Sequence, residues 1–151
     1  MSKQWKPEVI HENEWVTLWY HPEFKVVHHK FHKPIRGEPF RSFLQRGTAL
    51  LLSRGAKKWL SDDRLHFILP QEDQEWGETE WFPQTLKAGW RYWAIAKPEK
   101  AVADLYMRRL ASNWSAAGVR TELFIAPEAG MAWLTSLPEE PPPSSQLKQL
   151  P

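Results

Sequence analysis

Near its start the chain alternates short runs of β-branched and aromatic residues with short polar segments. The runs occupy residues 9–12, 15–20 and 25–31, and turn-forming residues occupy positions 13–14 and 21–23. Runs of this composition, separated by short turns, are typical of neighbouring strands. The pattern therefore predicts an N-terminal three-strand meander.

The pattern changes to a helical period over residues 38–54, where the apolar residues return to one helical face. Gly55 follows this segment and is placed to end the helix in a left-handed conformation. A short buried strand is expected next, at residues 57–61. The apolar residues of the predicted helix are Phe40, Phe43, Leu44, Leu50 and Leu51.

Helices and strands alternate over the rest of the chain. Between Pro70 and Gly89 we expect either a helix with a kink or two short helices, because Pro83 lacks the backbone donor that a helix interior uses. Three strands followed by this alternation predict an α/β fold, with a mixed sheet and crossover helices on its faces. The remaining elements are strands at 90–96 and 119–125 and helices at 98–117 and 127–137.

The length of 151 residues is close to the usual size of a single domain. We place that domain at residues 9–137, after a short N-terminal arm at residues 1–8. Residues 138–151 are rich in proline and offer little to bury, so a disordered tail is predicted there.

Composition narrows the classes of partner and chemistry. Twenty basic residues nearly balance 18 acidic ones, and the net charge of +2 gives no indication of a nucleic-acid partner. The absence of cysteine excludes disulfides and thiolate metal sites. No apolar run reaches the length of about 18 residues that a membrane span needs, and the N-terminus lacks the apolar core of a signal peptide. We therefore expect a soluble, cytoplasmic protein.

The loop Ser61, Asp62, Asp63 and Arg64 is the first candidate for chemistry, because ligands of open α/β sheets bind beyond the carboxyl ends of the strands. Its carboxylates, with Glu72 and Asp73 nearby, suit acid–base work or a hard cation such as Mg²⁺. The same side chains also suit a turn held by its own hydrogen bonds and by an Arg64 ion pair.

Three histidines lie close together in the sequence, but strand geometry separates them. His28 and His32 would stand roughly 13 Å apart on one face of a strand, while His29 points to the other face. They cannot share one metal ion, and zinc needs three or four converging ligands. We expect an inward set, Val27, His29 and Phe31, and a solvated set, His28, Lys30 and His32.

The ten tryptophans divide by position. Trp59, Trp93, Trp114 and Trp133 fall on predicted buried faces, so we assign them to the core. A second set flanks the acidic segment with Glu72 and Asp73, and it suits a pocket for an apolar or planar ligand or a dimer interface. This second set is Trp76, Trp81 and Trp90.

Several motifs along the chain resemble a known family. They are residues 55–64 (GAKKWLSDDR), 70–76 (PQEDQEW), 81–83 (WFP), 88–90 (AGW) and 93–94 (WA). With the order of the elements, they resemble a bacterial STAS-like family of small stand-alone proteins, related in fold to anti-sigma-factor antagonists and to the Sec14-like lipid-binding group. The resemblance spans residues 9–137, and the W-L-S-D-D-R stretch is its most specific part.

This resemblance implies a protein that regulates or binds without turnover. In the anti-sigma-factor antagonists, a partner kinase phosphorylates a serine or threonine that follows a central strand at the start of a helix. Ser61 is the hydroxyl residue in the corresponding loop, although its neighbours Asp62, Asp63 and Arg64 depart from the family motif. A phosphate beside two carboxylates would be repelled unless Arg64 compensated for them.

The sequence thus favours a non-catalytic signalling or protein-binding module with its functional edge at the Ser61–Arg64 loop. We expect no cofactor, no bound metal and no catalytic residue, and either a protein partner or a homodimer. Two alternatives stay open. One is a small enzyme or oxygen-ligand metal site that uses Asp62, Asp63, Glu72 and Asp73. The other is a carrier of a small apolar ligand or lipid, which predicts a tryptophan-lined cavity of several hundred cubic ångströms.

Overall fold

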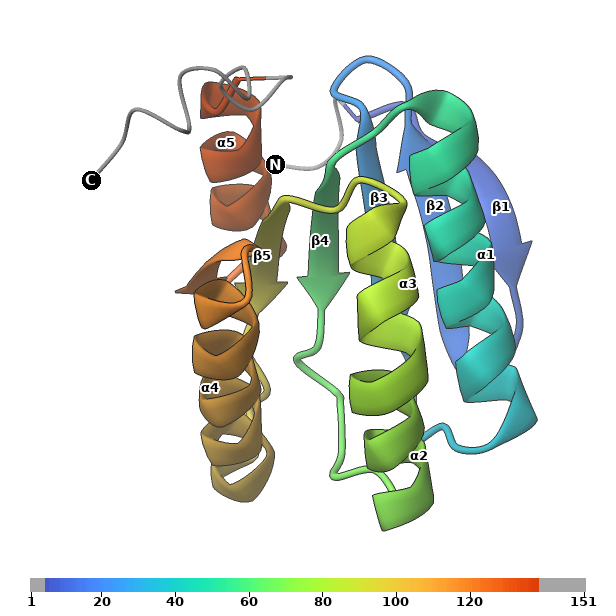
Figure 1. The fold of residues 1–151 in the computed structure, drawn as a ribbon, viewed down its shortest axis with the longest axis vertical. Coiled ribbons are helices and arrows are strands. Elements are labelled where there is room, and N and C mark those ends of the chain that lie inside the picture. The colour runs from blue at the N-terminus through green and yellow to red at the C-terminus, as the bar shows by residue number, and fades with distance from the viewer. Residues whose placement is uncertain (1–4, 139–151) are drawn as a thin grey trace.

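In the computed structural model, which describes residues 5–138, one six-stranded sheet carries helices on both faces (Figure 1). The strands are β1 (Glu8–Glu12), β2 (Val16–His21), β3 (Val26–Phe31), β4 (Lys58–Asp62), β5 (Tyr92–Ala96) and β6 (Arg120–Phe124). The helices are α1 (Glu38–Arg54), α2 (Gln71–Trp76), α3 (Phe82–Lys87), α4 (Ala101–Ala116) and α5 (Pro127–Ser136), and a π-helical turn, η2 (Gly77–Trp81), joins α2 to α3. The predicted mixed α/β fold, beginning with a meander, is confirmed.

The strands lie side by side in the order of the sequence. The pairs β1–β2 and β2–β3 are antiparallel, whereas β3 through β6 run parallel to one another. Each parallel step adds a strand on the same side of the last one, and crossovers between parallel strands are right-handed. The connecting helices α1, α2–α3 and α4 therefore lie on one face of the sheet, here called the front face (Figure 1).

Successive side chains of the central strands point to opposite faces of the sheet and belong to two separate apolar clusters. Trp59 and Trp93 point to the front face, where they join the larger cluster beneath the connecting helices. Leu60 and Ala94 belong to a smaller cluster on the back face, where they meet Met131 of α5. Since side chains point to opposite faces with a period of two, the short strands β4 and β5 serve both clusters.

Helix α1 begins and ends where the sequence predicts. Gly55 caps it in the left-handed conformation, with φ 63° and its N–H bound to the Leu51 carbonyl. Inside α1, Gly47 lies against the indole of Trp59, so that any added Cβ would collide with that ring.

The segment around Pro83 forms two short helices, α2 and α3, joined by the π-helical turn η2, which is one of the two arrangements expected there. The π-helical turn η2 directly precedes α3, and the Phe82 N–H bonds to the Gly77 carbonyl, five residues back. In this wider turn, just before Pro83, backbone N–H groups bond to carbonyls five residues back instead of four. Pro83 itself occupies the first turn of α3. Proline is tolerated in a first helical turn because the missing N–H has no intrahelical role there.

His28 departs from the solvated face predicted for it. Trp5, from the predicted N-terminal arm, packs edge-on against His28 and against His21 of the neighbouring strand. The His21 Nε2 and His28 Nδ1 atoms are 3.0 Å apart, and the buried Nε2 of His28 has no hydrogen-bond partner within residues 5–138. The expected inward set holds, because Val27 and Phe31 belong to the front cluster and His29 contacts Phe31. The predicted tail at 138–151 lies outside the described residues apart from Pro138.

We expect this histidine pair to make the protein less stable in mild acid. Burial lowers the pKa of His21 to about 4, and burial together with nearby positive charge lowers the pKa of His28 well below its ordinary value. Unfolding restores ordinary histidine pKa values near 6.5. Below that pH the two histidines therefore bind protons in the unfolded chain that they do not bind in the folded chain. The unfolding free energy should fall as the pH drops below about 6.5, by at most about 1.4 kcal/mol per pH unit for each histidine.

Urea denaturation followed at a series of pH values measures this slope. The variant His28→Gln removes one of the two groups, so its unfolding free energy should depend less steeply on pH in the acid range. Equal slopes for the variant and the parent protein would contradict the assignment.

A second stability prediction concerns Gly47. The variant Gly47→Ala forces its Cβ into the Trp59 ring and should lose about 1–3 kcal/mol of unfolding free energy. Gly77→Ala is the matched control, because Gly77 is also helical, with φ −60°, and its added Cβ meets nothing within 4 Å. That control should be neutral or gain about 0.5–1 kcal/mol from helix propensity. Similar effects of the two substitutions would show that Trp59 has room to move.

Candidate functional site

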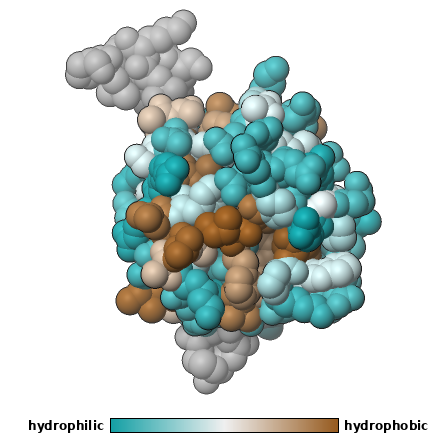
Figure 2. Space-filling view, turned by 90° about the horizontal axis from the view of Figure 1, so that it is seen from below, coloured by the Kyte–Doolittle hydropathy of each residue, from teal (hydrophilic) through white to brown (hydrophobic). Residues whose placement is uncertain are grey.

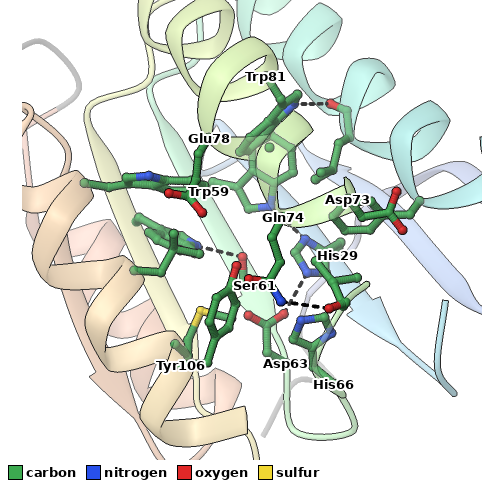
Figure 3. A pocket seen from close by; sticks show the side chains of 18 of the residues that line it. His29, Trp59, Ser61, Asp63, His66, Asp73, Gln74, Glu78, Trp81 and Tyr106 are labelled. Atoms are coloured by element: carbon green, nitrogen blue, oxygen red, sulfur yellow. Dashed lines mark hydrogen bonds and ion pairs between the residues drawn. The ribbon is translucent and has the colours of Figure 1, made fainter. Parts of the chain in front are cut away.

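A pocket opens at the carboxyl ends of β3, β4 and β5, beneath the helices of the front face (Figure 3). It encloses about 590 Å³, including its open mouth. Aromatic and aliphatic side chains form most of its wall, and a few polar groups lie among them. The apolar lining is Phe31, Phe40, Leu44, Trp59, Leu69, Trp81, Trp90, Trp93, Met107, Leu110 and Trp114; the polar lining is His29, Ser61, Asp63, His66, Asp73, Gln74, Glu78 and Tyr106.

Five indoles form a continuous cluster along the wall. Trp90 lies at the centre, with ring centroids 5.3 Å from Trp93 and 5.4 Å from Trp81. Trp114 of α4 lies 5.2 Å from Trp93, and Trp59 lies 5.5 Å from Trp81. All five are buried. Edge-to-face and tilted contacts at these distances add stability beyond the area that they bury.

The two tryptophan sets of the sequence prediction therefore merge in space. Trp81 and Trp90, assigned to the acidic segment, join Trp59, Trp93 and Trp114 in one cluster. Trp76 is only partly buried and packs outside the lining, edge-on against Phe40 and beneath the Arg41 guanidinium. Trp133 is also partly buried, on the back face.

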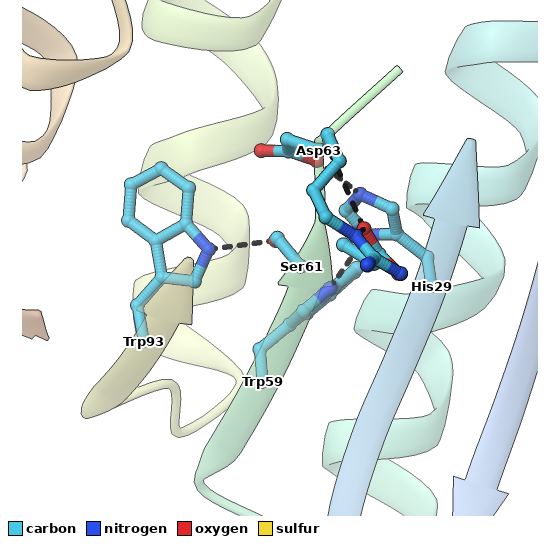
Figure 4. A network of polar contacts seen from close by, with 7 residues as sticks. His29, Trp59, Ser61, Asp63 and Trp93 are labelled. Atoms are coloured by element: carbon cyan, nitrogen blue, oxygen red, sulfur yellow. Dashed lines mark hydrogen bonds and ion pairs between the residues drawn. The ribbon is translucent and has the colours of Figure 1, made fainter. Parts of the chain in front are cut away.

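A chain of hydrogen bonds crosses the floor of the pocket (Figure 4). The Trp59 indole Nε1 donates to His29 Nδ1 at 2.9 Å, and His29 Nε2 lies 2.9 Å from Asp63 Oδ1. An indole N–H can only donate, so His29 Nδ1 has to accept. The proton of His29 therefore resides on Nε2 and is donated to Asp63. In this arrangement His29 is neutral and Asp63 is the charged member of the chain.

The second oxygen of Asp63 is left without a partner. Asp63 is 2% exposed, yet its Oδ2 forms no hydrogen bond or ion pair within residues 5–138. Asp63 lines the pocket, and Figure 4 shows the second oxygen directed away from His29. This oxygen is open to the pocket and offers an acceptor to whatever enters it.

Ser61 lies beside this chain on the same floor. It pairs in register with His29 across the parallel strands and accepts the Trp93 indole N–H at 2.7 Å. Its own hydroxyl proton is not used by any hydrogen bond within the described residues. Ser61 is 2% exposed and belongs to β4 itself, not to the start of a helix.

Two further polar groups complete the lining. His66, in the loop after β4, stacks on Phe31 with ring centroids 4.6 Å apart, and burial lowers its pKa, which keeps it neutral near pH 7. Burial also raises the pKa of Tyr106 of α4 to about 12, so its hydroxyl stays protonated. Neither ring has a hydrogen-bond partner within residues 5–138, and both remain available to a ligand.

The mouth of the pocket lies at the carboxyl edge of the sheet. Figure 2 looks onto this end and shows apolar side chains gathered across its centre. Large exposed apolar side chains come from two elements here, the loop between β4 and α2 and the start of α4. They are Leu65, Phe67, Ile68, Val102 and Leu105. Glu78 of η2 is exposed at the rim.

The remaining candidate acids are paired or exposed, and of these Asp73 alone lines the pocket. Asp62 does not line the pocket, and its carboxylate is held by two hydrogen bonds from the Arg64 side chain, at 2.9 and 2.8 Å. These bonds also raise the pKa of Arg64. Asp73 accepts the Gly37 N–H at 2.9 Å and an Arg41 hydrogen bond at 3.2 Å, and thereby ties α2 to the start of α1. Glu72 is exposed on α2.

The structure therefore separates the four acids that a metal site would have brought together. Asp62 and Asp63 follow one another at the end of β4, where neighbouring side chains point to opposite faces. Within residues 5–138, no group of three or more carboxylate and histidine side chains could hold a metal ion. The same part of the chain has no helix with the length and apolar character needed to cross a membrane.

Sequence reasoning placed two members of the floor, Ser61 and Asp63, and missed three others. His29 was assigned to the inner face of β3, and the register of β3 against β4 would have linked it to Ser61. His66 and Tyr106 carry no local signal, since only the path of the loop and the packing of α4 bring them to the pocket.

No protein-family model, curated protein or solved structure matches the chain. The STAS-like resemblance of its motifs stays a prediction.

We expect the Ser61–Trp93 hydrogen bond to stabilise the fold. The variant Ser61→Ala leaves the buried Trp93 N–H without an acceptor and should lose about 1–3 kcal/mol of unfolding free energy. Trp93→Phe removes the donor, so the double variant should lose less than the sum of the two single variants. Urea denaturation measures the cycle, with Ser53→Ala on the exposed side of α1 as the control. Additive losses would show that the bond contributes nothing.

Proposed function

We propose that the protein binds a small, mainly apolar molecule in the front-face pocket. The observation that carries this proposal is the composition of the lining, with a tryptophan wall and a few polar groups gathered at one end. Small-molecule sites combine a concave apolar wall with a small number of placed polar groups in this way.

Binding fits the hydrogen bonds of the floor better than turnover does. Both ring nitrogens of His29 are engaged, one with Trp59 and one with Asp63, so His29 has no free atom to take a proton from Ser61. Activation of a serine requires such a base within hydrogen-bond reach. The hydroxyl of Ser61 is instead oriented by Trp93 and has one donor to offer a ligand.

The burial of Ser61 also argues against a phosphorylation switch at this residue. A kinase needs access to the hydroxyl, and Ser61 lies at the bottom of the pocket beneath the helices of the front face. A phosphate there would meet the unpaired oxygen of Asp63, and like charges at close range repel. The apolar surface around the mouth, by contrast, suits the approach of an apolar molecule.

Calorimetric titration of the full chain with 1-naphthalenemethanol tests the proposal. This probe has a flat apolar body and one hydroxyl group. Leu110→Trp, which adds bulk to the pocket wall, should weaken binding by about tenfold or more, since overfilled packing is unfavourable. The control is Leu52→Trp, at a leucine of α1 that is exposed and lies outside the lining, and it should bind as the parent does.

Near-ultraviolet circular dichroism of each variant confirms that the fold is retained. Undetectable binding by the parent protein, or equal affinity for the parent and Leu110→Trp, would refute the pocket as the binding site.

A further inference from the structure

The charged side chains that line the pocket are acidic. Its titratable lining consists of the carboxylates Asp63, Asp73 and Glu78, with two histidines and a tyrosine, and no lysine or arginine of residues 5–138 belongs to it. Asp73 is already paired with Arg41 at the rim. Glu78 has no ion-pair partner in the described part of the chain, and the ion-pair contact of Asp63 is with the ring of His29.

Asp63 is the decisive group because its surroundings do not neutralise it. The hydrogen bond from His29 comes from a neutral ring, since Trp59 occupies the other nitrogen. His66, the other histidine of the floor, is kept neutral by burial. A carboxylate with neutral neighbours and one unpaired oxygen open to the pocket attracts a positive charge that enters it.

The walls reinforce the same preference. Indole faces carry a negative electrostatic potential and attract cations placed over them, most strongly when the cation is shielded from water. The front-face pocket presents five indoles and a neutral phenol around the floor. The neutral His66 ring adds a hydrogen-bond acceptor, which an ammonium group can use.

The mouth carries a smaller charge of the same sign. Glu78 lies near Tyr106, since its charge contributes to raising the pKa of that phenol after burial. Arg109 also acts on Tyr106, but it is exposed on α4 and does not belong to the lining. An entering cation therefore passes Glu78 at the rim before it reaches Asp63 at the floor.

From this arrangement we infer that the pocket selects organic cations, in which an ammonium group on an apolar or aromatic body pairs with the free oxygen of Asp63. The inference rests on the proposed function and names its ligand class. An anionic ligand is disfavoured, because both unpaired charges in and around the pocket would repel it.

Three probes of nearly equal shape test the selection. They are 1-naphthalenemethylamine, which is a cation at neutral pH, the neutral 1-naphthalenemethanol, and the anionic 1-naphthoate. The full chain should bind the amine about tenfold or more tightly than the alcohol, and the carboxylate most weakly, because a hydrogen bond between charged partners outweighs a neutral one.

Three variants identify the group responsible. Asp63→Asn keeps an acceptor for His29 but removes the charge, so the preference for the amine should fall to about threefold or less. Glu78→Gln at the exposed rim should weaken amine binding by about twofold, as expected for a screened surface charge. Glu80→Gln, in the same π-helical turn but outside the lining, is its control and should match the parent. Because Glu78 and Glu80 are exposed, the comparison of these two variants does not depend on the folding of the Asp63 variant.

Each outcome bears on one proposal or the other. Failure of all three probes to bind would overturn the proposed function and the selection with it. Binding of the alcohol as tightly as the amine, or tightest binding of the carboxylate, would overturn the cation preference and leave the pocket intact as a binding site. A full amine preference in folded Asp63→Asn would also overturn it.

Discussion

The hydrogen-bonded chain from Trp59 through His29 to Asp63 is the interaction on which the front face depends. Each link fixes the next: the indole sets the proton of His29 on Nε2, and that proton fixes one oxygen of Asp63. Trp59 can reach His29 only because Gly47 leaves room for its ring against α1. The side chain of Trp59 thus belongs to the sheet, packs against helix α1 and contributes to the pocket floor. A change at Gly47 would therefore act on all three. Buried polar networks of this kind are favourable when every member is satisfied, and here the one open position faces the pocket.

The order of the strands explains why such a pocket exists at this edge. Sequential parallel strands with right-handed crossovers gather three helical connections on one face, so the aromatic side chains of α3 and α4 meet those of β4 and β5 over the same floor. The π-helical turn then places the buried Trp81 in the wall and the exposed Glu78 at the rim of the same pocket. Such turns occur often at functional sites because they redirect side chains within an otherwise regular helix.

Much of this architecture could be predicted from the sequence, because it depends on residues that are close together along the chain. The strand runs, the helical period of α1 and the cap at Gly55 each depend on neighbours within a few residues, and the structure follows them closely. The floor depends on contacts far along the chain. Ser61 and Asp63 lie at the end of a buried strand and could be predicted, but His66 and Tyr106 reach the pocket through tertiary packing. Strand alternation separates the side chain of Asp62 from that of Asp63. The solvated face predicted for His28 was wrong because Trp5, remote in the strand pattern, covers it.

The five clustered indoles also make the protein a sensitive optical reporter of its own interior. Rings held at fixed tilts, with centroids 5.2 to 5.9 Å apart, are close enough for their excited states to couple. Such coupling gives a near-ultraviolet dichroism that depends on the mutual orientation of the rings and vanishes when fixed packing is lost, even where helices persist. Because these rings are also the pocket wall, any event that rearranges the wall alters the spectrum of the intact, unlabelled chain.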